Sequence, residues 1–387
     1  MYRQRSFNRS SRVPRGPRRP RSFDPTYLIN RAQTQSPTLE VIAIKNDFKN
    51  FKIEPQIKTN IINRGYLIPT PIQDKVIPLI LEGKDVVGVA NTGTGKTAAF
   101  LIPLVDKTYK NRDEKVLIIT PTRELAAQIE DEFRALNQNL GMYSVLCIGG
   151  AGMTNQINRL RQNPQFVIGT PGRLKDLEQR RVLNLRGFTT IVLDEVDRML
   201  DMGFIQDVQH LISFLPSQRQ SLFFSATIEG KVNQVMTKFL RNPVIISVKT
   251  SNIAENVVQK LVKIGNKNKI EVLHDLLIQP GFDRVLVFGR TKWQMEKLSA
   301  NLINRGFRAT SIHGNKTQGQ RQRALAQFKR GEVNILLATD VAQRGLDIED
   351  VTHVINFDLP ETQEDYIHRI GRTARADKKG VAISLMP

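Results

Sequence analysis

Short apolar runs alternate along the chain with longer stretches that carry apolar residues at helical spacing. Six runs between residues 85 and 248 are nearly continuous and rich in Val and Ile: DVVGVA, KVLIIT, QFVIGT, TIVLDE, SLFFSA and VIISV. A second series comprises KLVKI, RVLVFG, RATSIHG, NILLATD, HVINFD and VAISLM. Continuous runs of this kind are typical of parallel strands buried on both faces. Strands alternating with helices, such as RELAAQIEDEFRALNQ, predict two α/β domains with parallel sheets.

The polar segment KTSNIAEN, residues 249–256, lies between the two series and is the predicted linker. It divides the chain into a first domain over residues 41–248 and a second domain over residues 257–387. Residues 1–40 precede both domains, and the first 22 of them contain eight Arg and no acidic residue. Because such a composition cannot bury a core, we expect a disordered, Arg-rich tail here.

The charge balance favours a polyanionic partner. Lys and Arg number 57 against 37 Asp and Glu, which gives a net charge of +20. Nucleic acid is the first expectation and an anionic membrane surface is the second. No apolar run approaches the roughly 18 residues that a spanning helix needs, so no transmembrane helix is expected.

Two features bear on localisation. The single cysteine, Cys147, excludes an internal disulfide and fits a reducing compartment, so we expect a cytoplasmic protein. The Arg- and Ser-rich tail also resembles an organelle transit peptide, which keeps organelle targeting open as the alternative. The prolines of the tail oppose the amphipathic helix that such peptides need, so an RNA-binding tail is the preferred interpretation.

Polar clusters follow the apolar runs at once: NTGTGKT, PTREL, TPGR, DEVD, SAT, GRTK and TDVAQRGLD. In parallel sheets, ligands bind beyond the carboxyl ends of the strands. The pattern therefore predicts that these clusters form the functional sites.

The first cluster, ANTGTGKT, connects a predicted strand to a predicted helix. A Gly-rich turn that enters a helix offers backbone N–H groups to phosphates. In such a P-loop, Lys96 can reach the β and γ phosphates, and the Thr97 hydroxyl can ligate Mg²⁺. The usual pattern has Gly where Ala90 stands, so the strict motif is missed by one position. The predicted nucleotide-binding loop comprises Ala90, Asn91, Thr92, Gly93, Thr94, Gly95, Lys96 and Thr97.

Another predicted strand ends in the acids of IVLDEVD. A P-loop nucleotidase needs an acid at a strand end to hold Mg²⁺. We predict that Asp194 holds the metal through water and that Glu195 is the general base for the attacking water. A solvated acidic cluster would not explain the apolar residues just upstream, and a protease recognition site needs an exposed, flexible loop.

These motifs, in this order, resemble those of DEAD-box RNA helicases over about residues 45 to 385. The resemblance implies two tandem RecA-like P-loop domains, with ATP and Mg²⁺ as cofactors. In the family's nucleotide-base motif, here GYLIPTPIQ, Gln73 would read the adenine edge and Thr70 would support the P-loop. Either Tyr66 or the upstream Phe48 would stack on the adenine ring.

The family's RNA-binding motifs resemble PTRELAAQI, GG and TPGRL in the first domain and VFGRTK, HGNKTQGQR and ATDVAQRGLDI in the second. Small residues, hydroxyls and Arg at helix starts suit sugar–phosphate contacts, which do not read bases. The RNA-binding residues implied are Pro121, Thr122, Arg123, Gly150, Thr170, Pro171, Arg173, Arg290, Thr291, Arg321 and Thr339. The resemblance also implies that Asp347 binds the ATP ribose.

The remaining motifs would couple the two domains. HRIGRTAR nearly matches the family's motif six, in which Arg372 and Arg375 would be arginine fingers that reach the γ-phosphate across the cleft. These two residues complete a catalytic set with Lys96, Asp194 and Glu195. The coupling residues implied are Asp197, Ser225, Thr227, His368 and Arg369.

Three positions depart from the family pattern. Val196 replaces the Ala of DEAD, Asn315 replaces the usual Asp after HG, and Gln343 replaces a small residue. They bear on rate and RNA affinity and not on the class of protein. Val is favoured in strands, and we expect the Val196 side chain to face the core.

The sequence as a whole predicts an RNA-stimulated ATP hydrolase that locally unwinds or remodels RNA with little sequence preference. We expect a monomer that binds single-stranded RNA or short duplexes and has no membrane partner, with ribonucleoproteins as further partners. Two alternatives are an ATP-regulated RNA clamp with weak hydrolysis, which Val196 would favour, and a DNA translocase of the same superfamily.

Overall fold

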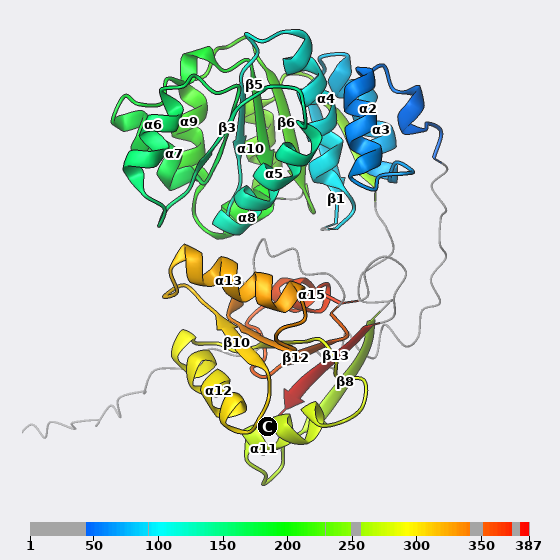
Figure 1. The fold of residues 1–387 in the computed structure, drawn as a ribbon, viewed down its shortest axis with the longest axis vertical. Helices are drawn as coiled ribbons and strands as arrows, with labels where there is room; N and C mark the ends of the chain where they lie inside the picture. Colours follow the sequence, from blue (N-terminus) through cyan, green and yellow to red (C-terminus); the bar gives the residue numbers. More distant parts are fainter. Residues whose placement is uncertain are drawn as a thin grey trace, which may run out of the picture.

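The computed structural model describes residues 44–91, 93–228, 230–248, 257–340, 351–373 and 380–386. Two parallel sheets follow one another along the chain, and helices cover both faces of each (Figure 1). This is the predicted fold class. The predicted basic tail and the predicted linker lie outside the described residues. No helix within these ranges has the length and apolarity needed to cross a membrane.

The first sheet, within the described residues, has seven parallel strands in the order β3-β4-β2-β5-β6-β1-β7. The strands are β1 (Val86–Ala90), β2 (Val116–Ile119), β3 (Ser144–Cys147), β4 (Phe166–Gly169), β5 (Thr190–Asp194), β6 (Gln220–Ser225) and β7 (Val244–Val248). Val86 and Ile118 pack against the helices on one face, whereas Val87 and Ile119 pack on the other. Both faces are therefore buried, which explains why the runs are continuously apolar.

Helices form two layers on this sheet. One face is covered by α2 (Pro55–Asn63), α3 (Pro71–Leu81), α4 (Lys96–Lys110) and α5 (Arg123–Leu136). The other face is covered by α6 (Met153–Leu160), α7 (Pro171–Gln179), α8 (Val196–Asp201), α9 (Ile205–Ser213) and α10 (Lys231–Phe239). The short 3₁₀ helices are η1 (Phe48–Asn50) and η2 (Leu185–Gly187). The helix expected over RELAAQIEDEFRALNQ is α5, and the Thr122 side chain caps it by accepting a hydrogen bond from the Leu125 N–H.

The second sheet has six parallel strands in the part of the chain that is described, in the order β10-β11-β9-β12-β13-β8. They are β8 (Val257–Lys263), β9 (Val285–Phe288), β10 (Ala309–Ile312), β11 (Ile335–Ala338), β12 (His353–Asn356) and β13 (Gly380–Met386). Helices α11 (Lys269–Leu277) and α12 (Lys292–Asn304) pack on one face, and α13 (Gln318–Lys329) packs on the other. In Figure 1, α13 and α15 (Gln363–Ile370) lie on the side of this domain that faces the first domain.

Two details differ from the sequence predictions. The edge strand β3 is not among the predicted strands, because its four residues begin with Ser144 and give too short an apolar pattern. Val196 begins α8 and does not extend a strand, because Glu195 before it turns the chain with φ 55° and ψ 53°. The Val196 side chain is 2% exposed and packs in the core, as predicted.

Candidate active site and nucleic-acid interface

Neighbouring strands of the first sheet bring the predicted motifs together at their carboxyl ends. Ala90 ends β1, Ser225 ends β6 and Asp194 ends β5. Because β6 lies between β1 and β5, these three strand ends adjoin. The P-loop, the SAT element and the acids therefore share one edge of the sheet, although they lie far apart in the sequence.

The P-loop turns through two glycines in the left-handed region, Gly93 with φ 83° and Gly95 with φ 88°. Residues with a side chain rarely adopt this conformation, so glycine is favoured at both positions. Lys96 begins α4, and its Nζ donates a 2.7 Å hydrogen bond to the carbonyl of Ala90. The ammonium group is thus folded over the loop at a helix N-terminus, where anions are favoured.

Gln73 and Thr70 support the P-loop from the side. The Gln73 amide accepts a 2.9 Å hydrogen bond from the Thr70 N–H and donates one of 3.1 Å to the carbonyl of Gly95. A side-chain carbon on Gly95 would lie only 2.5 Å from Gln73 Nε2 and 3.1 Å from Thr70 Oγ1. Thr70 therefore packs where the resemblance implies, and Gln73 packs beside it. The amide retains a second N–H and a second lone pair, so its predicted contact with adenine stays a prediction.

The two candidates for adenine stacking are not equally accessible. Phe48 is 3% exposed, and its ring stacks against that of Tyr66 with the centroids 6.4 Å apart. Tyr66 is partly exposed, and its hydroxyl donates a 2.7 Å hydrogen bond to Glu132 Oε1. Of the two alternatives, Tyr66 therefore presents the accessible ring, and Phe48 supports it from the core.

The Asp194 carboxylate is buried near the P-loop lysine. Burial raises the pKa of Asp194 to about 7, although the Lys96 ammonium opposes the increase. No group of three or more His, Cys, Asp or Glu side chains within the described ranges is arranged to bind a metal ion. Mg²⁺ usually takes one or two carboxylates together with substrate phosphates and water. Asp194 and the Thr97 hydroxyl therefore fit a Mg²⁺ that binds with the nucleotide and favours the ionised carboxylate.

Glu195 is fixed by its backbone and by a buried partner. Its left-handed conformation is uncommon for a residue with a side chain. Its Oε2 accepts a 2.8 Å hydrogen bond from Nη1 of Arg198, and the two side chains are only 6% and 4% exposed. None of the sequence motifs singles out Arg198, and the only signal is its place three residues after Glu195 in the sequence, within α8.

Asp197 connects the acids to the SAT element. Its Oδ2 accepts a 2.9 Å hydrogen bond from the Ala226 N–H, and its Oδ1 accepts one of 3.0 Å from the Arg198 N–H. Within the SAT element, Ser225 Oγ accepts a 3.4 Å hydrogen bond from the Thr227 N–H. The structure thus brings these predicted coupling residues together, and their role in coupling stays a prediction.

Predicted RNA-binding residues of both domains line one cleft of about 470 Å³. In the first domain, the Arg123 guanidinium covers the GG turn so closely that a side-chain carbon on Gly149 would lie 2.8 Å from its Nη2. Arg173 Nη1 donates a 3.3 Å hydrogen bond to the nearby carbonyl of Ala151. The predicted residues that line the cleft are Pro121, Thr122, Arg123, Thr170, Arg173 and, from the second domain, Arg321.

An ion pair joins the two domains inside this cleft. Arg321 Nε lies 2.9 Å from Glu124 Oε1, and the two side chains are 9% and 3% exposed. Burial lowers the pKa of Arg321, and the charge of Glu124 opposes the decrease. Because an unpaired buried charge is costly, each side chain needs the other in this arrangement. Glu124 is thus a further candidate for joining the two domains. It lies within the PTRELAAQI motif, but neither composition nor spacing singles it out.

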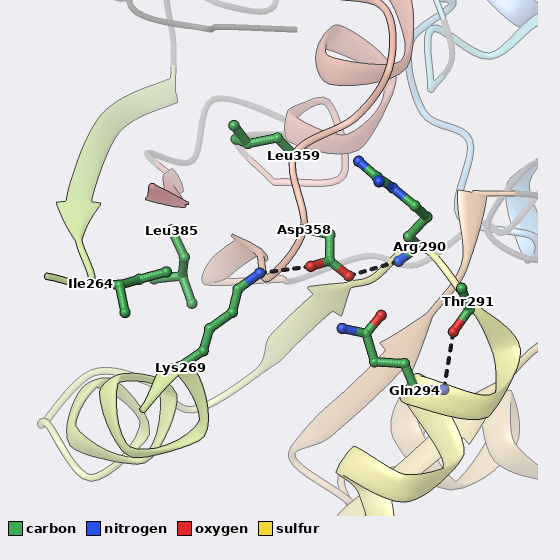
Figure 2. A pocket seen from close by; sticks show the side chains of 8 residues that line it. All are labelled: Ile264, Lys269, Arg290, Thr291, Gln294, Asp358, Leu359 and Leu385. Carbon is green, nitrogen blue, oxygen red and sulfur yellow. Dashed lines mark hydrogen bonds and ion pairs between the residues drawn. The ribbon is translucent and has the colours of Figure 1, made fainter. Parts of the chain in front are cut away.

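Arg290 and Thr291 lie in a different pocket, of about 360 Å³, on the second domain (Figure 2). Asp358 is at its centre, where Oδ1 accepts a 2.6 Å hydrogen bond from Lys269 Nζ and Oδ2 accepts one of 3.0 Å from the Arg290 N–H (Figure 2). The Thr291 hydroxyl accepts a hydrogen bond from the Gln294 N–H and caps α12. The structure therefore does not bring these two residues into the cleft that holds the other predicted RNA contacts.

Helix α15 brings motif six toward the acids of the first domain. Burial and the charge of Arg198 lower the pKa of His368 to about 4, while Asp197 opposes the decrease. Two first-domain charges thus act on a second-domain histidine.

Arg372 follows α15 and is 3% exposed. Thr339 lies at the carboxyl end of β11 and is 8% exposed, whereas Thr92, Gln343, Asp347 and Arg375 lie outside the described residues.

Arg369 makes contacts that a coupling residue would not require. Its Nε and Nη2 bind the Asp340 carboxylate at 2.6 and 2.7 Å, and its Nη1 donates to Asn356 Oδ1 at 3.1 Å. These partners belong to the second domain itself. The geometry therefore favours an anchor for α15 within its own domain over the predicted role in coupling.

Comparisons with known proteins agree with this arrangement. The DEAD/DEAH box helicase model matches residues 70–236, and the helicase conserved C-terminal domain model matches residues 268–377. The ATP-dependent RNA helicase CshA of Listeria monocytogenes is 44% identical over 88% of this chain and 66% of its own length. CshA of Bacillus subtilis is 42% identical over 88% of this chain and 69% of its own length. The chain belongs to the DEAD-box helicase family. It spans about two thirds of the length of these two relatives.

Solved structures resemble this DEAD-box protein across both domains. Saccharomyces cerevisiae Dbp5 bound to RNA and ADP BeF3 is 30% identical, with a TM-score of 0.78 over 88% of this chain and 90% of that one. Mss116p bound to ssRNA and AMP-PNP is 29% identical, with a TM-score of 0.81 over 90% and 76%. A DEAD box protein from Methanococcus jannaschii is 40% identical but scores 0.52, over 88% and 93%. The whole-chain score is therefore higher for the two RNA-bound structures than for the Methanococcus jannaschii protein, although that protein is more similar in sequence.

The Glu195–Arg198 pair leads to a prediction for this DEAD-box protein. Replacing Arg198 by Met is expected to lower kcat for ATP hydrolysis about 10- to 100-fold, because the Glu195 carboxylate loses its orientation. Arg198→Lys keeps a positive charge and is expected to recover part of the rate. Steady-state phosphate release measures kcat, and a melting curve checks the fold, since breaking a buried pair costs about 3 to 5 kcal/mol. A folded Arg198→Met variant with wild-type kcat would contradict the positioning role.

Proposed function

We propose that this DEAD-box protein is an ATP-dependent RNA helicase. It hydrolyses ATP with stimulation by RNA and locally unwinds or remodels RNA duplexes and RNA–protein complexes. The observation that carries the proposal is the single cleft lined by RNA-motif residues of both domains, on a protein whose P-loop and acids adjoin at one sheet edge. The relatives named ATP-dependent RNA helicases support it.

Each part of the proposed ATP site has a chemical role. Lys96 and the N–H groups at the start of α4 would hold the β and γ phosphates. Thr97 and Asp194 would hold Mg²⁺, which neutralises phosphate charge when bound. Glu195, oriented by Arg198, would accept the proton of the attacking water. Arg372 and Arg375 would stabilise the charge that develops on the γ-phosphate.

Both ligands are expected to favour the same arrangement of the domains. We propose that ATP lies between the P-loop of the domain over residues 41–248 and motif six of the domain over residues 257–387, with residues 249–256 as the linker. RNA would lie in the cleft that Glu124 and Arg321 span. Two ligands that stabilise one closed state bind cooperatively, and the effect is reciprocal.

The partners follow from the kind of contact. Arg side chains and hydroxyls at helix starts suit the RNA backbone, so we propose single-stranded RNA or short duplexes, bound with little sequence preference. We also propose that the protein is monomeric and cytoplasmic, acts on ribonucleoproteins and has no membrane partner. The cleft lined by RNA-motif residues supports nucleic acid, and not a membrane surface, as the partner of the positive charge.

The proposal is tested by ATP hydrolysis with and without single-stranded RNA. RNA is expected to raise the rate, and Lys96→Ala is expected to lower the stimulated rate by about tenfold or more, because the ammonium no longer binds the phosphates. Lys84→Ala is a matched control, since Lys84 forms a surface ion pair with Glu82 and should leave the rate unchanged.

The same assay separates the alternatives. Equal stimulation by DNA would favour the DNA translocase, and tight RNA binding in ATP with little phosphate release would favour the clamp. Val196 is the sequence feature behind the clamp, and its burial in the core supports hydrolysis instead. A wild-type rate that RNA does not change, together with strand separation that does not need ATP, would contradict the helicase.

A further inference from the structure

The chain contains a single tryptophan, Trp293, and its side chain is 75% exposed in the first turn of α12. Met295 and Leu298 of the same helix are buried, so the indole adds nothing to the core that holds α12 in place. Lys292 precedes it and Lys297 follows one helical turn later, and both are exposed. An exposed aromatic ring with cations beside it is the combination that binds single-stranded nucleic acid, because bases stack while phosphates are neutralised.

The first turn of α12 connects the two pockets described above. Lys292 Nζ donates a 2.8 Å hydrogen bond to Asn315 Oδ1. Asn315 follows Gly314, which lines the interdomain cleft. On the other side, Gln294 of this turn and Thr291, which caps the helix, line the pocket of Figure 2. A strand that leaves the cleft toward Arg290 would therefore pass this turn.

The carboxylate nearest to Trp293 along the helix is already paired. Glu296 lies 2.9 Å from His313 Nε2 and 3.4 Å from Lys316 Nζ. Although partial burial opposes ionisation, hydrogen bonds from Ser311 and His313 lower the pKa of Glu296 to about 2. Its negative charge is thus balanced by the Lys316 ammonium and engaged in hydrogen bonds with Ser311 and His313, so it repels a phosphate only weakly.

We propose that Trp293 is a stacking platform for one base of single-stranded RNA at the point where the strand leaves the interdomain cleft. Lys292 and Lys297 contact the phosphates on either side of that base. The proposal rests on the proposed function and adds a residue that lies outside every motif named above. Since every base has a π-face, the platform adds affinity without adding sequence preference.

The platform has a direct spectroscopic test. Because Trp293 is the single tryptophan of the chain, all the tryptophan fluorescence of the protein comes from it. Adding oligouridylate to the full-length protein is expected to quench tryptophan fluorescence as a base stacks on the ring. Inorganic polyphosphate, which has the charge but no bases, is expected to leave the fluorescence nearly unchanged.

Variants test the contribution to RNA binding. Trp293→Ala is expected to raise the oligouridylate concentration that half-saturates ATP hydrolysis by about 5- to 100-fold, the range for loss of one stacked base. Trp293→Phe keeps an aromatic face and is expected to stay close to wild type. The matched control is Ile303→Ala, which removes a 52% exposed apolar side chain from the other end of the same helix and should have no effect.

The outcomes separate this inference from the function on which it rests. RNA stimulation without quenching, or with a wild-type half-saturating concentration in Trp293→Ala, would overturn the platform and leave the helicase standing. Equal quenching by polyphosphate would show a response to charge alone and would also overturn the platform. A wild-type protein that RNA does not stimulate would overturn the helicase and, with it, the basis of the platform.

Discussion

Glu195→Gln is expected to lower kcat for RNA-stimulated ATP hydrolysis by about 10²- to 10⁴-fold, the usual cost of losing a positioned general base. The amide has the size of the carboxylate and can still accept the hydrogen bond that Arg198 Nη1 donates at 2.8 Å. The side chain therefore keeps its place while it loses its basicity. Binding of ATP and RNA is expected to remain, because neither the P-loop nor the RNA cleft is altered.

Phosphate release across ATP and RNA titrations measures this effect, and binding of a fluorescent ATP analogue checks the first-domain site. Asp131→Asn is the matched control, since the Asp131 side chain is 76% exposed on the surface of the first domain. It should hydrolyse ATP at the wild-type rate. Turnover of Glu195→Gln close to that of the control would show that another group is the base.

Arg372→Ala is expected to lower kcat by about 10³-fold or more, the usual effect of removing an arginine finger. Arg372 is 3% exposed, and it lies on the second domain, whereas Lys96 and Asp194 belong to the first. Its charge also acts on His368, whose pKa responds to Arg198 and Asp197 of the first domain. Loss of Arg372 should therefore affect the transition state far more than the initial binding of ATP.

Full-length kinetics together with ATP dissociation constants test this expectation. Arg330→Ala is the control on the same domain, because Arg330 is 61% exposed and pairs only at the surface with Glu332. A folded Arg372→Ala variant that keeps the kcat of this control would refute the finger. Arg375, which the resemblance implies as the second finger, would then be the residue expected to stabilise the γ-phosphate.

The strands and the placement of the motifs were predictable because both follow from patterns that can be seen within short stretches of sequence. Strands buried on both faces need continuous apolar runs, and ligand-binding loops follow their carboxyl ends. Thus the sequence alone places Asp194 at a strand end and Lys96 at the end of the loop that follows one. The strand β3, which lies at the edge of the first sheet among the described residues and pairs with β4, carries too little of this pattern to be predicted.

The contacts that set the roles of single residues were not predictable. Gln73 meets the carbonyl of Gly95, 22 residues away, and Arg369 meets Asp340, 29 residues away. Such pairs depend on how elements pack, and no local pattern reports them. The same holds for Phe48 and Tyr66, which are both aromatic but differ in exposure only through tertiary packing.

The position of β6 has a consequence for the timing of the catalytic cycle. Its ladder pairs Ser225 with Val89 of β1 and Phe224 with Asp194 of β5. A strand cannot slip by one residue without turning all its side chains to the opposite face. The phosphate-binding end and the acidic end of the first domain are thus fixed at a constant spacing. Under the proposed function, the change that switches hydrolysis on and off would then come from movement of the second domain against this fixed edge, and not from movement within the first sheet.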